Sequence, residues 1–174
     1  MQTKGQSLQE RLLAVLNEEL RTTCEPLFSA LPLDEAMPSL LPKRAAAEEH
    51  CRLAADAVVS DAVRARQELA AGIWLYVDDL ERSHEVSQGI ASASGSFWHA
   101  IMHRREGDFG NSKYWLRRAA PHPAVKGLPG YDPYGFVDQV QASGGDDPLH
   151  LLQMQREEWM ALFAWSAKGV GGEL

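Results

Sequence analysis

Ser83 to Pro123 reads SHEVSQGIASASGSFWHAIMHRREGDFGNSKYWLRRAAPHP, and the rest of the chain is interpreted around this stretch. It contains four of the six histidines and two of the five tryptophans, among closely spaced Arg, Glu, Asp and Asn residues. A helix that serves only as scaffold needs an apolar stripe and a polar outer face. The mixture of side chains found here therefore marks the stretch as the candidate functional site.

Two histidines of this stretch, His99 and His103, stand four residues apart in WHAIMH. On a helix this spacing places both imidazoles on one face, one turn apart, where they can chelate one metal ion. The zinc-protease motif HExxH is absent, because Ala100 stands where that motif has glutamate. The cofactor is unknown from the sequence; if an ion is bound, it is a divalent transition metal and His84 is the best candidate for the third ligand. The alternative ligands are Glu106, Asp108 and His122. Without a metal, the imidazoles would donate to neighbouring carboxylates inside a polar pocket.

Acid–base chemistry is a second use for the same side chains. An imidazole beside a carboxylate can transfer a proton to or from a bound molecule. The candidate catalytic residues are His99, His103 and Glu106. Asp108 is less favoured, because an aspartate at the start of a helix commonly caps it.

Ligand recognition is predicted from the residues on either side of Gly107. Arg104 and Arg118 can form a fork for a carboxylate or phosphate. Asn111, near a helix N-terminus, adds donors that favour an anion. Tyr114 and Trp115 offer flat walls for a ring or a sugar face. The expected ligand is therefore a small anionic molecule, and whether the protein is an enzyme stays open.

The stretch also repeats part of the sequence before it, at an offset of 29 residues. The matching pairs are Ala71 with Ala100, Asp79 with Asp108, Leu80 with Phe109, and Ser83 with Ser112. Each copy is typical of two helices joined by a tight turn. The segment GDFGNSKYWLRRA resembles the turn and second helix of a tetratricopeptide repeat, with Ser112 in place of the first of its two alanines and Ala119 as the second. Two copies are fewer than a repeat array needs, so we predict stacked helical hairpins only.

The remainder of the chain is also typical of helices. Apolar residues recur at helical spacing, Ser7 followed by Glu10 is a capping-box signal, and the period-2 alternation of strands is scarce. The expected helices are 7–23, 43–59, 60–77, 80–88, 97–106, 111–119, 135–141 and 149–168. Two long Pro-rich loops are expected at 25–43 and 121–133 and a shorter loop at 89–96, and loop 25–43 is apolar enough to lie across the core. We predict one all-α domain over residues 1–174, with a signature core at 83–123.

Composition narrows the function classes. The 174 residues carry a net charge of −7 and a pI near 5.3, which argues against a nucleic-acid footprint and against binding to anionic membrane surfaces. No window approaches the ~18 apolar residues of a membrane span, and the first residues lack the apolar core of a signal peptide. Cys24 and Cys51 have no metal-type spacing and are expected to be reduced, partly buried thiols. A soluble, cytoplasmic protein is expected.

The signature stretch resembles a widespread family of uncharacterised proteins from bacteria and fungi. The family pattern is SHxxxQ, a loop, then GxxWHxxxHRxExDxxNAxYWxRR and HP. It is met here by Ser83, His84, Gln88, Gly95, Trp98, His99, His103, Arg104, Glu106, Asp108, Asn111, Tyr114, Trp115, Arg117, Arg118, His122 and Pro123. Ser112 departs from the pattern, which has alanine there. The resemblance covers about a quarter of the chain and implies that these residues act as one unit, but it brings no activity with it.

Three functions are compatible with these observations. The leading hypothesis is a small-molecule site between the two hairpins, which becomes a hydrolytic or oxidative site if a metal is bound. The second is a tetratricopeptide-like module that binds a protein partner or peptide in an exposed groove. The third is a polar network that only locks the helical domain together.

Overall fold

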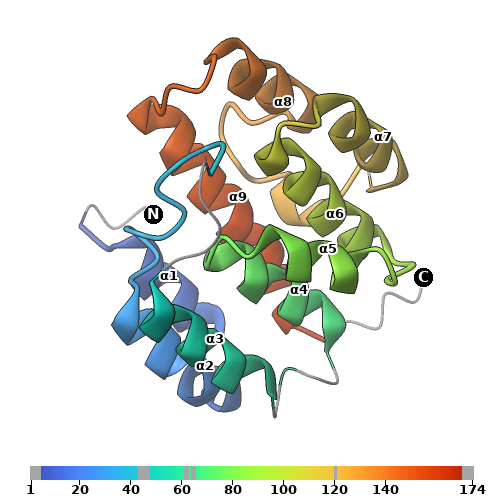
Figure 1. The fold of residues 1–174 in the computed structure, drawn as a ribbon. Coiled ribbons are helices and arrows are strands. Elements are labelled where there is room, and N and C mark those ends of the chain that lie inside the picture. The colour runs from blue at the N-terminus through green and yellow to red at the C-terminus, as the bar shows by residue number, and fades with distance from the viewer. Residues whose placement is uncertain (1–4, 43–47, 61–62, 64–65, 120, 170–174) are drawn as a thin grey trace.

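The computed structural model describes residues 5–42, 48–60, 63, 66–119 and 121–169, and all regular structure among them is helical (Figure 1). The α-helices are α1 (Leu8–Val15), α2 (Glu18–Ala30), α3 (Glu49–Ser60), α4 (Gln67–Tyr76), α5 (Leu80–Ser87), α6 (Ala93–Glu106), α7 (Phe109–Ala119), α8 (Pro133–Ala142) and α9 (Leu149–Ala167), with a 3₁₀ turn η1 (Pro123–Val125). The all-α prediction is confirmed. None of these helices is long and apolar enough to cross a membrane. Cys24 and Cys51 are both free and buried.

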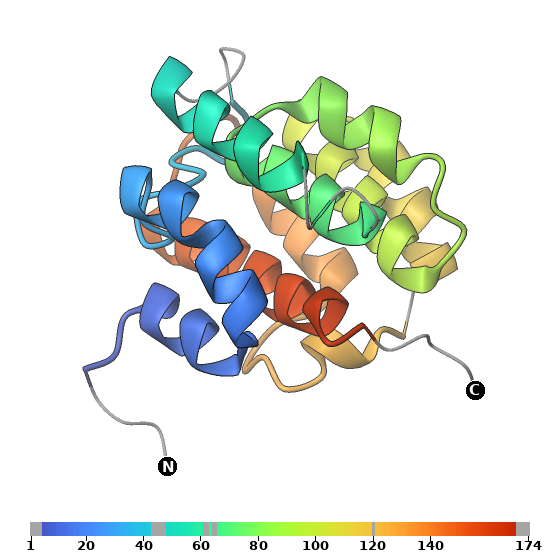
Figure 2. The same ribbon diagram turned by 90° about the horizontal axis from the view of Figure 1, so that it is seen from below.

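The longest helix, α9, runs between the two halves of the molecule. Figures 1 and 2 place α1, α2 and α3 on one side of it and α4 to α7 on the other. Trp159 of α9 stacks on Phe163 and donates its indole N–H to the carbonyl oxygen of Gly72 at 2.8 Å. Gly72 also allows the Trp98 ring to approach α4 closely, because a Cβ there would lie 2.9 Å from that ring. The main core is therefore closed by large aromatic residues around one glycine of α4.

The N-terminal helices differ from the prediction in two places. The capping box of Ser7 and Glu10 is present, but the expected helix 7–23 is divided, because Asn17 accepts from the Leu20 N–H and starts α2. Pro26 does not end α2, which continues to Ala30. Proline removes one helical N–H, and here it lies on the exposed side, where water can reach the freed carbonyl. The Pro-rich loop therefore begins at residue 31 and not at 25.

The loop after α2 lies across the core, as its apolar residues predicted. Leu33, Ala36, Met37 and Leu40 are buried in it. Polar side chains of α9 hold its backbone: Gln155 donates to the Met37 and Ser39 carbonyls, and Arg156 donates to the Ala36 carbonyl at 2.7 Å. Asp147 accepts from the Leu40 N–H at 2.8 Å. This loop is thus fixed by hydrogen bonds rather than by helical structure.

Helices α4–α5 and α6–α7 form two hairpins whose turns repeat at the predicted offset. Asp78 and Gly107 occupy equivalent positions, and both have left-handed backbones, with φ of 59° and 89°. The next residue in each copy, Asp79 or Asp108, donates its N–H to the carbonyl oxygen five residues earlier, of Trp74 or His103, at 2.9 Å in both. This is the hydrogen-bond pattern of a Schellman helix end. The turn of each hairpin is therefore built in the same way.

The matched serines also repeat one contact. Ser83 of α5 donates to the Ala71 carbonyl at 2.9 Å, and Ser112 of α7 donates to the Ala100 carbonyl at 2.7 Å. All four residues are buried. A small hydroxyl side chain lets the two helices of a hairpin approach closely while it satisfies a backbone acceptor. The internal repeat is thus a repeat of structure, whereas the resemblance to tetratricopeptide repeats stays a prediction.

The remaining boundaries differ modestly from the prediction. Ser92 caps α6, so the helix starts at Ala93 and includes the second half of the expected loop 89–96. Loop 121–133 contains η1, and α8 starts at Pro133. Residues 43–47 of the second predicted helix, the Asp61 cap of the third and the glycines 171 and 172 lie outside the described residues.

Candidate functional site

Three histidines meet where α5 packs against α6. His84 comes from α5, and His99 and His103 come from successive turns of α6. The ring centroids are 4.9 Å apart for His84 and His99, 5.5 Å for His84 and His103, and 4.7 Å for His99 and His103. One nitrogen from each ring can be chosen so that all three lie within 4.8 Å of one another. The predicted metal ligands are thus brought together.

His99 is the most unusual member of this trio. It is 3% exposed, and neither Nδ1 nor Nε2 has a hydrogen-bond partner among the residues that the structure describes. Burial lowers the pKa of His99 to about 4, with a further contribution from His103 and His84. The ring is therefore neutral near pH 7 and carries one free lone pair. Leaving a buried polar group unsatisfied costs about 1–3 kcal/mol, which a bound metal would offset.

His103 is oriented by an acid from the next turn of its own helix. Its Nδ1 lies 2.6 Å from Oε1 of Glu106. When the imidazole is neutral, this contact places the proton on Nδ1, because a carboxylate only accepts, and leaves the lone pair on Nε2. Carboxylates behind metal-bound histidines fix the ring in this manner. Glu106 therefore lies beside the histidines, as predicted, in a position that orients one of them.

Aromatic side chains of α7 close one side of the trio. The indole of Trp115 stacks on His99, with centroids 4.0 Å apart and planes inclined by 22°. Tyr114 meets the Trp115 ring edge-on at 5.4 Å and is 44% exposed. The stack shields one face of His99 from water. His84 is only partly buried, so the trio is more accessible on the α5 side.

A second group of potential ligands shares His103 with the first. His103, Glu106 and Asp108 also have donor atoms within 4.8 Å of one another. Asp108, however, accepts from both the backbone and side-chain N–H groups of Asn111, and these bonds lower the pKa of its carboxyl. Asp108 thus caps α7, as predicted, and Asn111 is an exposed partner of that cap. The three histidines are the better ligand set because the His99 nitrogens have no hydrogen-bond partner among the described residues.

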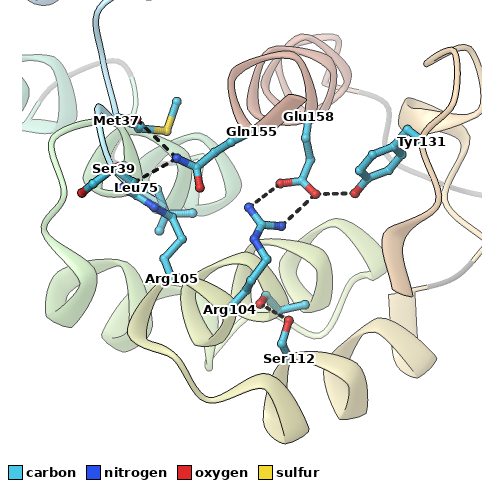
Figure 3. A network of polar contacts seen from close by, with 10 residues as sticks. Met37, Ser39, Leu75, Arg104, Arg105, Ser112, Tyr131, Gln155 and Glu158 are labelled. Atoms are coloured by element: carbon cyan, nitrogen blue, oxygen red, sulfur yellow. Dashed lines mark hydrogen bonds and ion pairs between the residues drawn. The ribbon is translucent and has the colours of Figure 1, made fainter. Parts of the chain in front are cut away.

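Arg104 has a partner that the sequence did not indicate. Its guanidinium makes two hydrogen bonds to Glu158 of α9, at 2.9 and 2.8 Å, and both side chains are buried (Figure 3). Tyr131 donates to the same carboxylate, and the guanidinium lies over the Phe136 ring at 4.5 Å. Burial, followed by the Glu158 charge, raises the pKa of Tyr131. Arg104 therefore joins three segments of the chain.

Arg105 belongs to a neighbouring internal network. It donates to the carbonyls of Leu75 and Ser39 (Figure 3). It also pairs with Asp78 at 2.5 Å. Burial lowers its pKa, and the Asp78 charge opposes that shift. Asp78 thus combines a left-handed backbone with an ion pair, so it holds the first hairpin turn against α6.

Arg118 lies in a different environment from Arg104, so the two do not form the predicted fork around one anion. The Arg118 guanidinium lies 5.4 Å from the centroid of Trp115 and donates to the Tyr114 hydroxyl at 3.3 Å. Arg117 lies over Tyr114 at 5.9 Å. Both arginines are exposed, and neither is paired with an acid among the described residues.

His122, an alternative ligand in the prediction, lies in another contact. Its Nε2 is 2.9 Å from the Ser94 hydroxyl, and its Nδ1 accepts from the Ala124 N–H. This places the proton on Nε2, so Ser94 is the acceptor. A serine nucleophile needs the opposite arrangement, in which the imidazole accepts the serine proton. The pair is buried and fixes the chain after α7 to the start of α6.

No family model, curated protein or solved structure matches this chain. The family resemblance of the signature stretch therefore stays an expectation, and a function must be inferred from the site itself.

Proposed function

We propose that the protein binds one divalent transition-metal ion through His84, His99 and His103, and that a small anionic molecule binds at the ion. The observation that carries this proposal is His99, a buried imidazole with two unpartnered nitrogens beside two further histidines. A polar network that only locks the fold would be expected to satisfy its buried members.

The ligand set favours certain metals. Neutral imidazoles suit zinc, copper, iron and nickel, whereas magnesium and calcium prefer oxygen. Zinc-bound imidazole nitrogens lie about 2.0–2.1 Å from the ion. The three nitrogens now lie within 4.8 Å of one another and must therefore move closer together when an ion binds. Because His84 is partly exposed, the shift is least hindered on the α5 side.

Three protein ligands leave one position for a substrate or a water molecule. Structural zinc sites have four protein ligands, and catalytic sites have three and an open position. When bound, such an ion polarises a carbonyl or phosphoryl group, or lowers the pKa of its water. Around it, Glu106 would hold the His103 ring in place, and Trp115 would exclude water from one side of His99. The chain thus offers the parts of a metal-dependent enzyme.

The protein-interaction alternative rests on the two stacked hairpins. It predicts an exposed groove that binds a peptide and gives no role to three histidines with converging nitrogens. Metal analysis separates the two proposals, because a peptide-binding module has no need of stoichiometric metal.

The test is elemental analysis of tag-free protein after incubation with Zn²⁺, Co²⁺, Ni²⁺ or Fe²⁺ and removal of the excess. We expect about one ion per chain for at least one metal. His99→Ala and His84→Ala should each lose the ion while circular dichroism shows an unchanged helical content. His150→Ala is the matched control, because His150 is exposed on α9 and outside the trio. The proposal is wrong if wild-type protein stays metal-free, or if His99→Ala keeps as much metal as His150→Ala.

A further inference from the structure

Building on the proposed metal site, we infer that its ligand is a small molecule with two anionic groups, one bound by the metal and the other by Arg118. This assignment names the substrate class, and it identifies Arg118 as the specificity-determining residue. A molecule with a single anionic group would satisfy only the metal.

Arg118 has the free hydrogen-bonding capacity that such a ligand requires. A guanidinium carries five N–H donors in a planar fork that fits a carboxylate or phosphate. Among the described residues, the Arg118 guanidinium makes one hydrogen bond, to the Tyr114 hydroxyl. The other donors face solvent. Lys113, in the same helix, differs because it is paired with Asp138 at 2.5 Å.

The position of Arg118 relative to the histidines is set by Trp115. The ring centroids of Trp115 and His99 are 4.0 Å apart, and the central carbon of the Arg118 guanidinium lies 5.4 Å from the indole centroid. The indole therefore links the cation to the histidine trio. Trp115 and Arg118 both belong to α7, and the indole is partly exposed. A short molecule that lies along the indole edge can therefore reach the ion with one end and Arg118 with the other.

The charge of the protein makes this arrangement selective. The chain carries a net charge of −7, which repels anions in general. Arg117 and Arg118 are adjacent, exposed and unpaired with acids among the described residues. Arg117 lies over the Tyr114 ring, and Arg118 lies over the Trp115 ring that stacks on His99. Local positive charge at this edge, next to a divalent ion, would attract a dianion more strongly than a monoanion.

The test uses Co²⁺-loaded protein, whose visible spectrum reports anion binding at the ion. The probes are acetate, succinate, glutarate and phosphonoacetate. We expect succinate, glutarate or phosphonoacetate to bind at least about tenfold more tightly than acetate, since one charge-assisted hydrogen-bond pair gives about this factor. Comparing succinate with phosphonoacetate identifies whether the second anionic group is a carboxylate or a phosphonate. Comparing succinate with glutarate shows which distance between the two anionic groups fits the site better.

Arg118→Gln should remove this preference, because it weakens the binding of the dianions more than that of acetate, and should leave the Co²⁺ content unchanged. Arg117→Gln is the matched control, because it changes the net charge equally at the neighbouring position and should keep most of the preference. Equal binding of acetate and the dianions by wild-type protein refutes the inference, and so do equal effects of the two substitutions. Those results would leave the metal site intact, whereas protein that takes up no Co²⁺ or other metal would refute the proposed function itself.

Discussion

Replacing Arg104 by methionine tests whether this residue holds the fold or binds a ligand. The Arg104 and Glu158 side chains are 2% and 1% exposed, and two hydrogen bonds of 2.9 and 2.8 Å join them. Arg104→Met would leave the Glu158 carboxylate buried with Tyr131 as its remaining donor. Removing one partner of a buried ion pair costs about 3–5 kcal/mol. The packing of the guanidinium on Phe136 is replaced by that of the methionine side chain.

The assay is urea unfolding followed by circular dichroism, with the free energy of unfolding extrapolated to water. Lys113→Met is the matched control, because Lys113 pairs with Asp138 at an equally short distance but with side chains 34% and 61% exposed. An exposed pair contributes about 0–1 kcal/mol, so this variant should unfold almost as wild type does. The contrast between the two variants isolates burial as the cause.

The double variant Arg104→Met with Glu158→Met completes the test. It removes both charges, so it should be more stable than Arg104→Met alone by about 2 kcal/mol or more. If Arg104→Met does not fold, recovery of a folded double variant gives the same information. The reasoning is refuted if Arg104→Met lies within about 1 kcal/mol of wild type, or if the second substitution recovers nothing.

Four further predictions follow from single contacts. In metal-free protein, the lowered pKa of His99 means that the unfolded chain binds more protons than the folded chain between about pH 4 and 6.5. The free energy of unfolding should therefore decrease, by on the order of 2 kcal/mol, as the pH is lowered through this window, and His99→Gln should remove most of this decrease in urea titrations at each pH. Zn²⁺ at 100 times its dissociation constant should raise the free energy of unfolding by about 2.7 kcal/mol in wild type but not in His99→Gln. Gly72→Ala should lower the free energy of unfolding by about 1–3 kcal/mol in urea titrations, because its Cβ would meet Trp98 at 2.9 Å. Gly110→Ala, whose Cβ would have no neighbour closer than 3.9 Å, should be neutral or stabilising in the same titrations. Gly107→Ala should cost about 1–2 kcal/mol, because φ at this position is 89°, and a variant as stable as wild type would show that the turn can change its conformation.

Much of the fold could be predicted because its signals are local. Helical periodicity, the cap of Ser7 and the repeated turn all depend on residues within a few positions of one another. The errors have the same origin. A proline usually ends a helix, but Cys24 before Pro26 and Leu27 and Phe28 after it are buried, and their tertiary packing holds the helix together on both sides.

In the candidate site, too, local contacts could be predicted from the sequence and long-range contacts could not. His99 and His103 could be paired from their spacing, and His84 could be added because the preceding helix had to pack nearby. The partner of Arg104 could not be predicted, because Glu158 is 54 residues away in the sequence, in a helix that has little amphipathic pattern and is buried on most sides. Arg104 was therefore interpreted as a ligand residue from its neighbours alone. A charged residue inside a signature stretch can thus pair with a distant part of the chain, as Arg104 does, instead of binding a ligand.

The internal repeat helps to distinguish scaffold from site. Residues that agree between the copies, such as Ser83 and Ser112, make the same contact in both hairpins. The residue equivalent to His103 is Trp74, 29 positions earlier, and both rings are buried. The equivalent of His99 is Ala70.

The hairpin can therefore form with an indole and a methyl group at the positions of these two imidazoles. Packing alone does not require histidine at either position, and burial of His99 without a hydrogen bond is a cost that packing leaves uncompensated. A ligand that bonds to the imidazole nitrogens provides that compensation. The difference between the two copies thus favours a bound metal over a purely structural role.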